Sequence, residues 1–457
     1  MERNLTQGSV FRNILAFSLP YLLSYFLQTL YGMADLFIIG QFEGVASTTA
    51  VSVGSQVMHM LTVMIVGLAM GSTVSIARAV GGKDRAGASA AVGNTVTLFL
   101  ALSLALMGAL LLCVGPIVSA LSVPAEAAAG ARDYLTICFI GIPFITAYNI
   151  LSSIFRGMGD SKSPMYFIAA ACMANIALDY LFMGALRMGP AGAALGTTLS
   201  QAFSVAIALA VIRRRDSGVR LSRGDLRPRR AVMGRLLSIG VPVALQDGFI
   251  QVAFLLITVI ANRRGLSDAA AVGIVEKIIS FLFLVPSSML STVSALGAQN
   301  LGAGRPDRAR RTLGCAVVLA AGFGLMAALA MQGAAEPVVA LFTDAGRTDG
   351  ARVVELGGQY LRGYVWDCLF AGVHFCFSGY FCACGRSGLS FLHNVSAILL
   401  VRVPGAVWTS ARFPDTLFPM GLATSAGSLL SVLICLAAYG ALWRRERREN
   451  EESGIRN

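Results

Sequence analysis

The sequence predicts an all-α polytopic membrane protein, with 12 transmembrane helices in two pseudo-symmetric six-helix lobes. Long uncharged runs, an uneven distribution of basic residues and an internal repeat lead to this fold class. The chain of 457 residues is 56% hydrophobic and only 13% charged, with a mean hydropathy of +0.71. Soluble domains carry about 25% charged residues. This composition therefore excludes a soluble enzyme, a disordered chain and a nucleic-acid-binding protein.

The apolar residues lie in long runs. No Asp, Glu, Lys or Arg occurs in residues 44–77, 86–125, 188–212, 278–304, 312–335 and 416–443. A helix needs about 20 apolar residues to cross a bilayer, and continuous apolarity favours helices over a barrel, whose strands alternate in hydrophobicity. We predict spans at 11–41, 45–77, 88–114, 127–156, 164–187, 190–212, 235–262, 269–298, 310–333, 353–384, 389–411 and 416–443.

Basic residues predict the orientation of these spans, because cytoplasmic loops are enriched in Lys and Arg. With the N-terminus in the cytoplasm, the cytoplasmic segments hold 26 of the 36 Lys and Arg residues, and 9 lie in or near the opposite loops. Arg263 and Arg264 are exceptions on the outer side. No basic region precedes a short apolar core at the start, so we expect no cleaved signal peptide. We predict a multi-pass protein of the cell (inner) membrane with both termini cytoplasmic.

The two halves of the sequence resemble each other. The turn Gly81-Gly-Lys-Asp84-Arg85-Ala86 recurs as Gly304-Arg-Pro-Asp307-Arg308-Ala309, at an offset of 223, and Pro20 recurs as Pro242, at an offset of 222. Both copies begin inside, so the repeat is parallel, which is typical of transporters with a cavity between two lobes. A turn signal shared by unrelated helices is the simpler alternative. The predicted domains are an N-terminal lobe (1–212), a basic cytoplasmic linker (213–234), a C-terminal lobe (235–443) and a cytoplasmic tail (444–457).

Acidic residues inside the spans are the first candidates for function. Five of them are the candidates: Asp35, Asp179, Asp247, Glu276 and Asp367. A carboxylate in hydrocarbon costs several kcal/mol unless it is protonated, paired or facing water, so function is the default hypothesis for each.

The first span carries a polar face. Gln28, Tyr31 and Asp35 are spaced i, i+3 and i+7 and therefore lie on one side of a helix. Pro20 permits a kink earlier in the same helix, so protonation of Asp35 could be coupled to a change of shape. An Asp35 solvated at the outer interface is the alternative.

Asn175 and Asp179, spaced i and i+4, share a face of the fifth span. Their amide and carboxylate oxygens could coordinate a hard cation, or Asp179 could share a proton with Asp35. An ordinary polar contact between helices explains the pair equally well.

The second half repeats this pattern incompletely. Gln246 and Asp247 follow Pro242 on the seventh span. Glu276 is followed by Lys277 on the eighth span, where the two residues could form a structural, neutralising pair.

Asp367 and His374 are titratable residues two turns apart on the tenth span. Each could lie in or near the pore, and a packed histidine is the alternative to a proton relay. The 9 cysteines lie in apolar spans, and Cys382-Ala-Cys384 lacks a second ligand pair, so we expect neither a zinc site nor a disulfide. No nucleotide-binding motif occurs, so transport would have to use an ion gradient.

Taken together, these residues resemble the multidrug and toxic compound extrusion (MATE) family. The resemblance covers essentially all predicted spans. The motifs that carry it are Pro20 with Tyr31 and Asp35, Asn175-x-x-x-Asp179, Phe155-Arg-Gly-Met-Gly-Asp160, Gly192-Ala-Ala-Leu-Gly-Thr197 and Ala298-Gln-Asn-Leu-Gly-Ala-Gly304.

The resemblance implies two six-helix lobes, alternating access, and export of amphipathic organic cations in exchange for H⁺ or Na⁺. It implies a cation site in the N-terminal lobe, at Asp35, Asn175, Asp179 and Thr197, with Gln28, Tyr31 and Asn149 nearby. It implies no enzymatic activity, no cofactor beyond the coupling ion, no metal beyond Na⁺ at that site, and a monomer whose partners are its substrates and membrane lipids. Ile250 stands where some family members carry a glutamate, and Val373 or His374 where they carry an aspartate.

Two other functions remain open. A flippase for lipid-linked oligosaccharides would share the fold, but it should line its cavity with Arg and Lys. Lys277 is the only basic residue clearly inside a span, and Arg402 lies near the end of the eleventh span. A receptor or channel without coupled transport is the third candidate, and the duplicated architecture argues against it.

Overall fold

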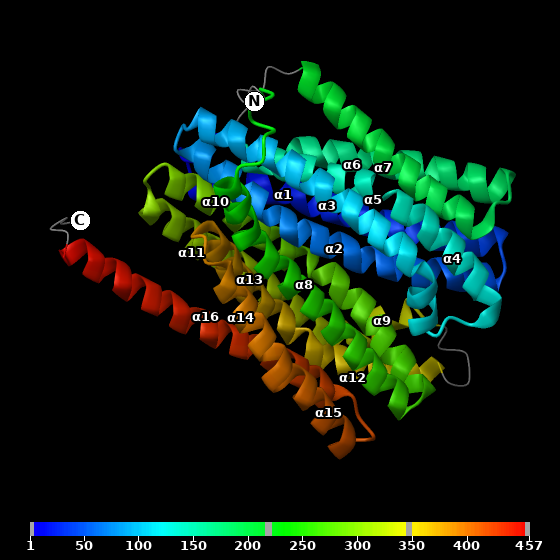
Figure 1. Cartoon of the computed structure of the whole chain (residues 1–457). Coiled ribbons are helices and arrows are strands. Elements are labelled where there is room, and N and C mark those ends of the chain that lie inside the picture. Colours follow the sequence, from blue (N-terminus) through cyan, green and yellow to red (C-terminus); the bar gives the residue numbers. More distant parts are fainter. Residues whose placement is uncertain (1–3, 215–221, 344–349, 453–457) are drawn as a thin grey trace. The chain divides into compact units, whose positions relative to one another are not determined.

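The computed structural model describes residues 4–214, 222–343 and 350–452, and these residues contain helices but no strands. The helices are α1 (Val10–Phe42), α2 (Val45–Gly81), α3 (Arg85–Ala120), α4 (Ala125–Ile140), α5 (Ile142–Gly157), α6 (Lys162–Asp179), η1 (Tyr180–Ala185), α7 (Gly189–Arg214), α8 (Arg230–Arg264), α9 (Leu266–Leu282), α10 (Leu284–Gly302), α11 (Pro306–Ala340), α12 (Gly350–Tyr364), α13 (Trp366–Ala383), α14 (Ser387–Ala397), η2 (Ile398–Arg402), α15 (Val403–Arg412) and α16 (Phe418–Glu452). Figure 1 shows them in chain order from blue to red.

The helices reproduce the predicted spans one for one. Within the described residues, 11 helices are long and apolar enough to cross a membrane, and the bent pair α4–α5 brings the number to 12. Large apolar side chains on the outsides of the helices, such as Leu112 and Met173, are exposed, as expected of surfaces that face lipid. The prediction of a twelve-span all-α membrane fold is therefore confirmed.

The helices begin and end where the sequence supplies caps. Ser9 accepts a hydrogen bond from the Arg12 backbone N–H at the start of α1, and Asp84 accepts one from the Gly87 N–H, 2.8 Å away, at the start of α3. Gly159 and Gly385 close the turns after α5 and α13 with φ of 88° and 73°, a backbone conformation that favours glycine. These turns separate consecutive spans.

The described residues fall into two compact units. Unit 1 comprises the residues up to Ala244 together with Ala295–Ala309, and unit 2 comprises Leu245–Ser294 with the residues from Arg310 onward. The chain therefore passes between the units within α8, within α10 and within the first turns of α11. Part of the basic linker, residues 215–221, lies outside the described residues, so the lobe boundaries at 213–234 stay a prediction.

Unit 1 packs around α2. Its main apolar cluster joins α2, α4 and α7 through buried residues such as Tyr134, Phe139 and Ala194, and a second cluster joins α5 and α6 through Phe155 and Phe167. Gly71 allows α2 to lie against the backbone of α8, because a Cβ there would overlap the Leu236 carbonyl. In the same unit, α6 packs against both α1 and α7.

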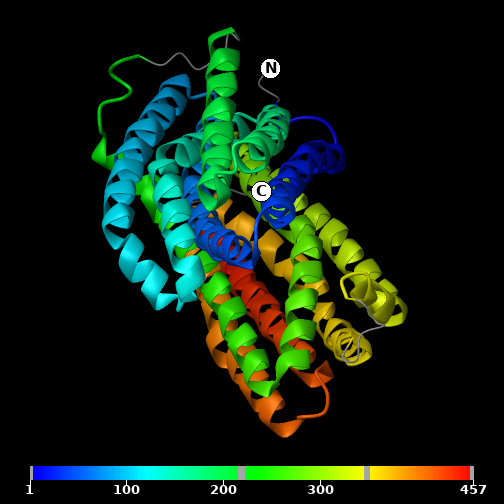
Figure 2. The ribbon, with the colours of Figure 1, turned by 90° about the vertical axis from the view of Figure 1, so that its right-hand side faces the viewer.

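The segment before α8 is bound to α3, as Figure 2 shows for the green trace beside the light-blue helix. The Asn94 side chain donates to the Asp225 carbonyl (3.2 Å) and accepts from the Arg229 N–H (2.7 Å). Thr97 donates to the Leu226 carbonyl at 2.8 Å. The C-terminal end of the predicted linker is therefore part of unit 1.

Candidate functional site

Four side chains from three helices meet in the interior of unit 1. Asp35 comes from α1, Asn175 and Asp179 from α6, and Thr197 from α7. The Thr197 hydroxyl donates to Asp35 Oδ2 at 3.1 Å, and Asn175 Nδ2 donates to Asp179 Oδ1 at 3.4 Å. The carboxyl groups of Asp35 and Asp179 lie within hydrogen-bonding reach of each other. The four residues that the family resemblance assigns to a cation site are thus together in the structure, and we call them the carboxylate cluster.

The carboxylate cluster is dry and incompletely bonded. Asp35 is 2% exposed, and Asn175 and Asp179 are fully buried. Asp35 Oδ1, Asn175 Oδ1 and Asp179 Oδ2 have no hydrogen-bond partner among the described residues. Buried oxygens are normally paired, and two adjacent carboxylates in a dry site cannot both stay ionised. These three oxygens suit a proton or a small hard cation, which prefers oxygen ligands.

A glycine makes room for the cluster. A Cβ at Gly196 would overlap Asp179 Oδ1 and would lie 3.5 Å from Asn175 Nδ2. Gly196 precedes Thr197 on α7, so the same turn of this helix leaves space for one carboxylate and donates a hydrogen bond to the other. Gly192-Ala-Ala-Leu-Gly-Thr197 was singled out as a motif, but its contact with Asp179 could not be read from the sequence.

Further polar groups surround the cluster. The Tyr31 hydroxyl lies beside Thr197 and Gln201. On α4, Tyr134 forms a hydrogen bond with Ser55, 3.0 Å between the oxygens. Sequence reasoning found Tyr31 but missed Gln201 and Tyr134. Gln201 lies one helical turn after Thr197, and that spacing was the signal available for it.

The helix that carries Asp179 changes its winding directly after this residue. The π-helical turn η1 follows α6 without a break. Such wide turns are rare and are often found at functional sites. Span five was predicted as one regular helix, because hydropathy carries no information on hydrogen-bond register.

Gln28 and Asn149 line a pocket of unit 1, together with Tyr148 and Arg156, and none of the four cluster residues belongs to its lining. Pro20 lies inside α1, which is helical from Val10 to Phe42, and Pro242 lies inside α8. Whether either proline acts as a hinge stays a prediction.

In unit 2, the predicted residues are bound to other side chains. Asp367 is fully buried and accepts a hydrogen bond from Arg402 Nη2 at 2.5 Å, and the same nitrogen donates to Ser428 at 3.1 Å. His374 stacks edge-to-face on His393, with ring centroids 5.4 Å apart. Arg402 and His393 were not recognised as partners, because the sequence does not show which faces of α13, α14 and η2 meet.

The remaining candidates of unit 2 lie apart from this pair. Gln246 accepts a hydrogen bond from Ser390 at 2.5 Å. Glu276 accepts one from Thr258 on α8 at 3.2 Å, and Lys277, its predicted partner, is exposed. Asp247 follows Gln246 on α8 and is partly buried.

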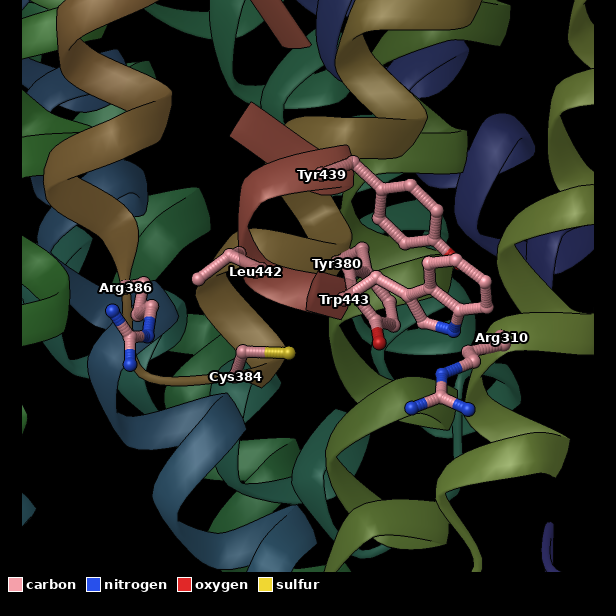
Figure 3. Close-up of a pocket in the computed structure, with 7 residues that line it drawn as sticks. All are labelled: Arg310, Tyr380, Cys384, Arg386, Tyr439, Leu442 and Trp443. Carbon is pink, nitrogen blue, oxygen red and sulfur yellow. The ribbon is translucent and has the colours of Figure 1, made fainter. Parts of the chain in front are cut away.

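A second pocket lies in unit 2 and contains none of the predicted site residues. Figure 3 shows the Cys384 thiol among Arg310, Tyr380, Tyr439 and Trp443. Cys382 is buried. Within the part of the chain that the structure describes, no three His, Cys, Asp or Glu side chains come together as a metal site would require.

Among the described residues, the 11 apolar helices, or 12 with the bent pair counted as one span, define a multi-pass membrane protein. The MatE family model matches residues 20–181 and 242–408, so this chain belongs to the MatE family.

Individual relatives agree with this assignment. The probable multidrug resistance protein YpnP of Bacillus subtilis (strain 168) is 27% identical over 421 residues, covering 92% of this chain and 93% of the relative. The multidrug export protein MepA of Staphylococcus haemolyticus is 24% identical over 380 residues, 83% of each chain. A crystal structure of MATE in complex with MaL6 has the same fold, with a TM-score of 0.88 at 22% identity, covering 98% of this chain and 99% of that one.

Proposed function

We propose that this protein is a secondary active multidrug efflux transporter, which exports amphipathic organic cations in exchange for H⁺ or Na⁺ by alternating access. The observation that carries the proposal is the carboxylate cluster, with its three buried and unpartnered oxygens. The names of the relatives support the choice of cargo. The absence of a nucleotide-binding motif from the sequence supports an ion gradient as the source of energy.

The chemistry of the exchange follows from charge. Asp35 and Asp179 together can hold one proton, or one Na⁺ with the oxygens of Asn175 and Thr197. Either ion lowers the negative charge of the site and so weakens its attraction for an organic cation. Binding of the ion from outside would then promote release of the cargo from the same site.

The proposal extends to the membrane location, the oligomeric state and the partners of the protein. The protein is a monomer in the inner membrane with both termini in the cytoplasm, and its partners are small amphipathic substrates and membrane lipids, with no nucleic acid. It has no enzymatic activity and needs no cofactor other than the coupling ion.

Vesicles with an imposed gradient test the energy source. We expect efflux of a cationic dye when H⁺ or Na⁺ is more concentrated outside the vesicles than inside, and none with ATP alone. The ion whose gradient drives efflux is the coupling ion. Efflux with ATP and without either gradient would contradict the proposal, and transport of a lipid-linked oligosaccharide without dye transport would favour the flippase.

Gly196→Ala tests the space beside Asp179. The new methyl group would overlap Asp179 Oδ1 and displace the carboxylate from Asn175. We expect coupled efflux to fall at least about tenfold, because displacements of the order of 1 Å in a binding site can cost up to a hundredfold.

Gly108→Ala is the matched control, because a Cβ at this helical glycine of α3 meets nothing within 4 Å. It should leave efflux unchanged and slightly favour the helix. Equal efflux by the two variants would remove Gly196 from the site.

A further inference from the structure

The C-terminal ends of α2 and α10 make a reciprocal backbone contact within unit 1. A Cβ at Gly81 of α2 would overlap the Gln299 carbonyl, and a Cβ at Gly302 of α10 would overlap the Arg78 carbonyl. Glycine at both positions therefore lets the two backbones touch.

The residues in this contact are equivalent in the internal repeat. Gly81 and Gly302 are 221 positions apart, and so are Arg78 and Gln299, close to the offsets of 222 and 223 found elsewhere in the chain. A contact between equivalent residues is self-complementary and lies on the axis that relates them. In transporters built from parallel repeats, this axis runs along the membrane normal and the cargo site lies at the repeat interface. The contact therefore lies across the expected path of the cargo.

The Gln299 side chain ties this contact to two other segments of unit 1. Its amide oxygen accepts a hydrogen bond from the Leu5 backbone N–H at 3.3 Å, and its amide nitrogen donates to the Gly157 carbonyl, at the end of α5, at 3.2 Å. Leu5 and Gln299 are each 1% exposed. The N-terminal segment, residues 4–9, is thus anchored at the end of α10, and we call it the N-terminal strap.

Two arginines hold the N-terminal strap from the other side of the α10–α11 turn. Arg305 Nη1 donates to the Thr6 carbonyl at 2.9 Å, and Arg308 Nη2 donates to the Gln7 carbonyl at 2.9 Å. The strap therefore binds both the last turn of α10 and the first turn of α11.

The helix ends can separate without leaving unpaired backbone groups. The Arg78 carbonyl accepts a hydrogen bond from the Gly82 N–H, and the Gln299 carbonyl accepts one from the Ala303 N–H, each at 3.0 Å. These bonds lie within one helix end, so separation breaks none of them. The side-chain bonds to the strap are exchanged for bonds to water, at a small net cost.

We propose that the reciprocal contact and the N-terminal strap form a gate, which closes the cytoplasmic end of the transport path and is shut in this structure. The inference rests on the proposed function, which supplies alternating access and the cytoplasmic position of the N-terminus. Release of the strap lets the ends of α2 and α10 part, so that cargo enters from the cytoplasm. The gate closes again before the cargo leaves on the other side.

Locking the gate shut tests this role directly. Gln7→Cys combined with Arg308→Cys places two thiols at one of the strap bonds, and a short bifunctional methanethiosulfonate joins them through disulfides. We expect the cross-linked protein to lose gradient-driven efflux and dithiothreitol to restore it. The two single variants, treated in the same way, are the controls and should keep efflux. A contact that only stabilised the fold would allow transport when locked.

A second measurement needs no transport. In Leu5→Cys, reaction with a water-soluble maleimide, read at residue 5 by peptide mass spectrometry, reports release of the strap. Adding Gly302→Ala should raise this rate at least about tenfold, because the methyl group overlaps the Arg78 carbonyl and disfavours the closed gate. Gly322→Ala is the matched control, because a Cβ at this helical glycine of α11 meets nothing within 4 Å, and it should leave the rate unchanged.

Arg305→Met gives the same readout without altering the reciprocal contact, since it removes only the bond to the strap. Its control is Arg311→Met, which removes an exposed arginine of α11. Unchanged thermal unfolding shows that a variant is folded. Full efflux by the cross-linked protein, or equal labelling rates in the test variants and their controls, would overturn the gate. Absence of efflux from untreated wild type would instead refute the proposed function, and the labelling rates are measured independently of it.

Discussion

Coupled efflux is expected to fall to the level of empty vesicles when Asp35 and Asp179 are both replaced by asparagine. Each single change, Asp35→Asn or Asp179→Asn, should have the same effect. An amide cannot take up the coupling proton and carries no charge to hold Na⁺, so the ion gradient would no longer be linked to cargo movement. The measurement is dye efflux from vesicles under an imposed pH gradient and, separately, a sodium gradient.

These variants should remain folded in the membrane. Asparagine has nearly the size of aspartate, and its carbonyl oxygen can still accept the hydrogen bond from Thr197 or Asn175 that the carboxylate accepts now. Removing a charge from a dry site also removes its desolvation cost. Asp247→Asn is the comparison variant and should reduce efflux less. Wild-type efflux from a well-expressed double variant would move the coupling site out of unit 1.

The spans could be predicted from the sequence because mean hydropathy is averaged over many residues. The breaks within the spans could not be predicted in this way. The predicted spans at 127–156, 269–298 and 353–384 are each divided in the structure, at Gly141, Phe283 and Val365, and α4 and α5 meet at an angle of 48°. A break of one residue hardly changes the mean hydropathy of a segment, so these bends depend on packing that the pattern does not record.

The candidate site was predictable where residues on one helix share a face, as Asn175 and Asp179 do. The assignment of Asp35 and Thr197 to the same site came from family resemblance, since spacing within one helix does not show which helices meet. Gln201, with no motif to mark it, was missed for that reason. The coupling role of all these residues stays a prediction.

Arg264 shows how structure explains an exception to the charge rule. This arginine, on the predicted outer side, pairs with Asp268 at 2.7 Å and donates to the carbonyls of Ser410, Phe413, Pro414 and Thr416. Its charge therefore serves to hold the loop between α15 and α16 in unit 2. The sequence shows only an arginine in an unfavoured loop and not the carbonyls that it binds.

Breaking the Asp367–Arg402 pair should destabilise unit 2, and the two halves of the pair should not be equivalent. Asp367→Asn leaves a guanidinium in the interior without a counter-charge, and arginine cannot shed its proton to become neutral. We expect a loss of about 3–5 kcal/mol in unfolding free energy. Arg402→Met should cost less, because the carboxyl group that remains can take up a proton and avoid a buried charge.

The asymmetry can be measured by thermal unfolding of the purified variants in detergent. Arg412→Met, which removes an exposed arginine of α15, should change stability by no more than about 0.5 kcal/mol. Combining Asp367→Asn with Arg402→Met should recover most of the stability lost in Asp367→Asn, since no unpaired charge then remains. If Arg402→Met were as damaging as Asp367→Asn, or if the combined variant were the least stable, the cost would come from lost packing around Ser428 instead of from an uncompensated charge. The double variant thus separates the electrostatic origin of the effect from a steric one.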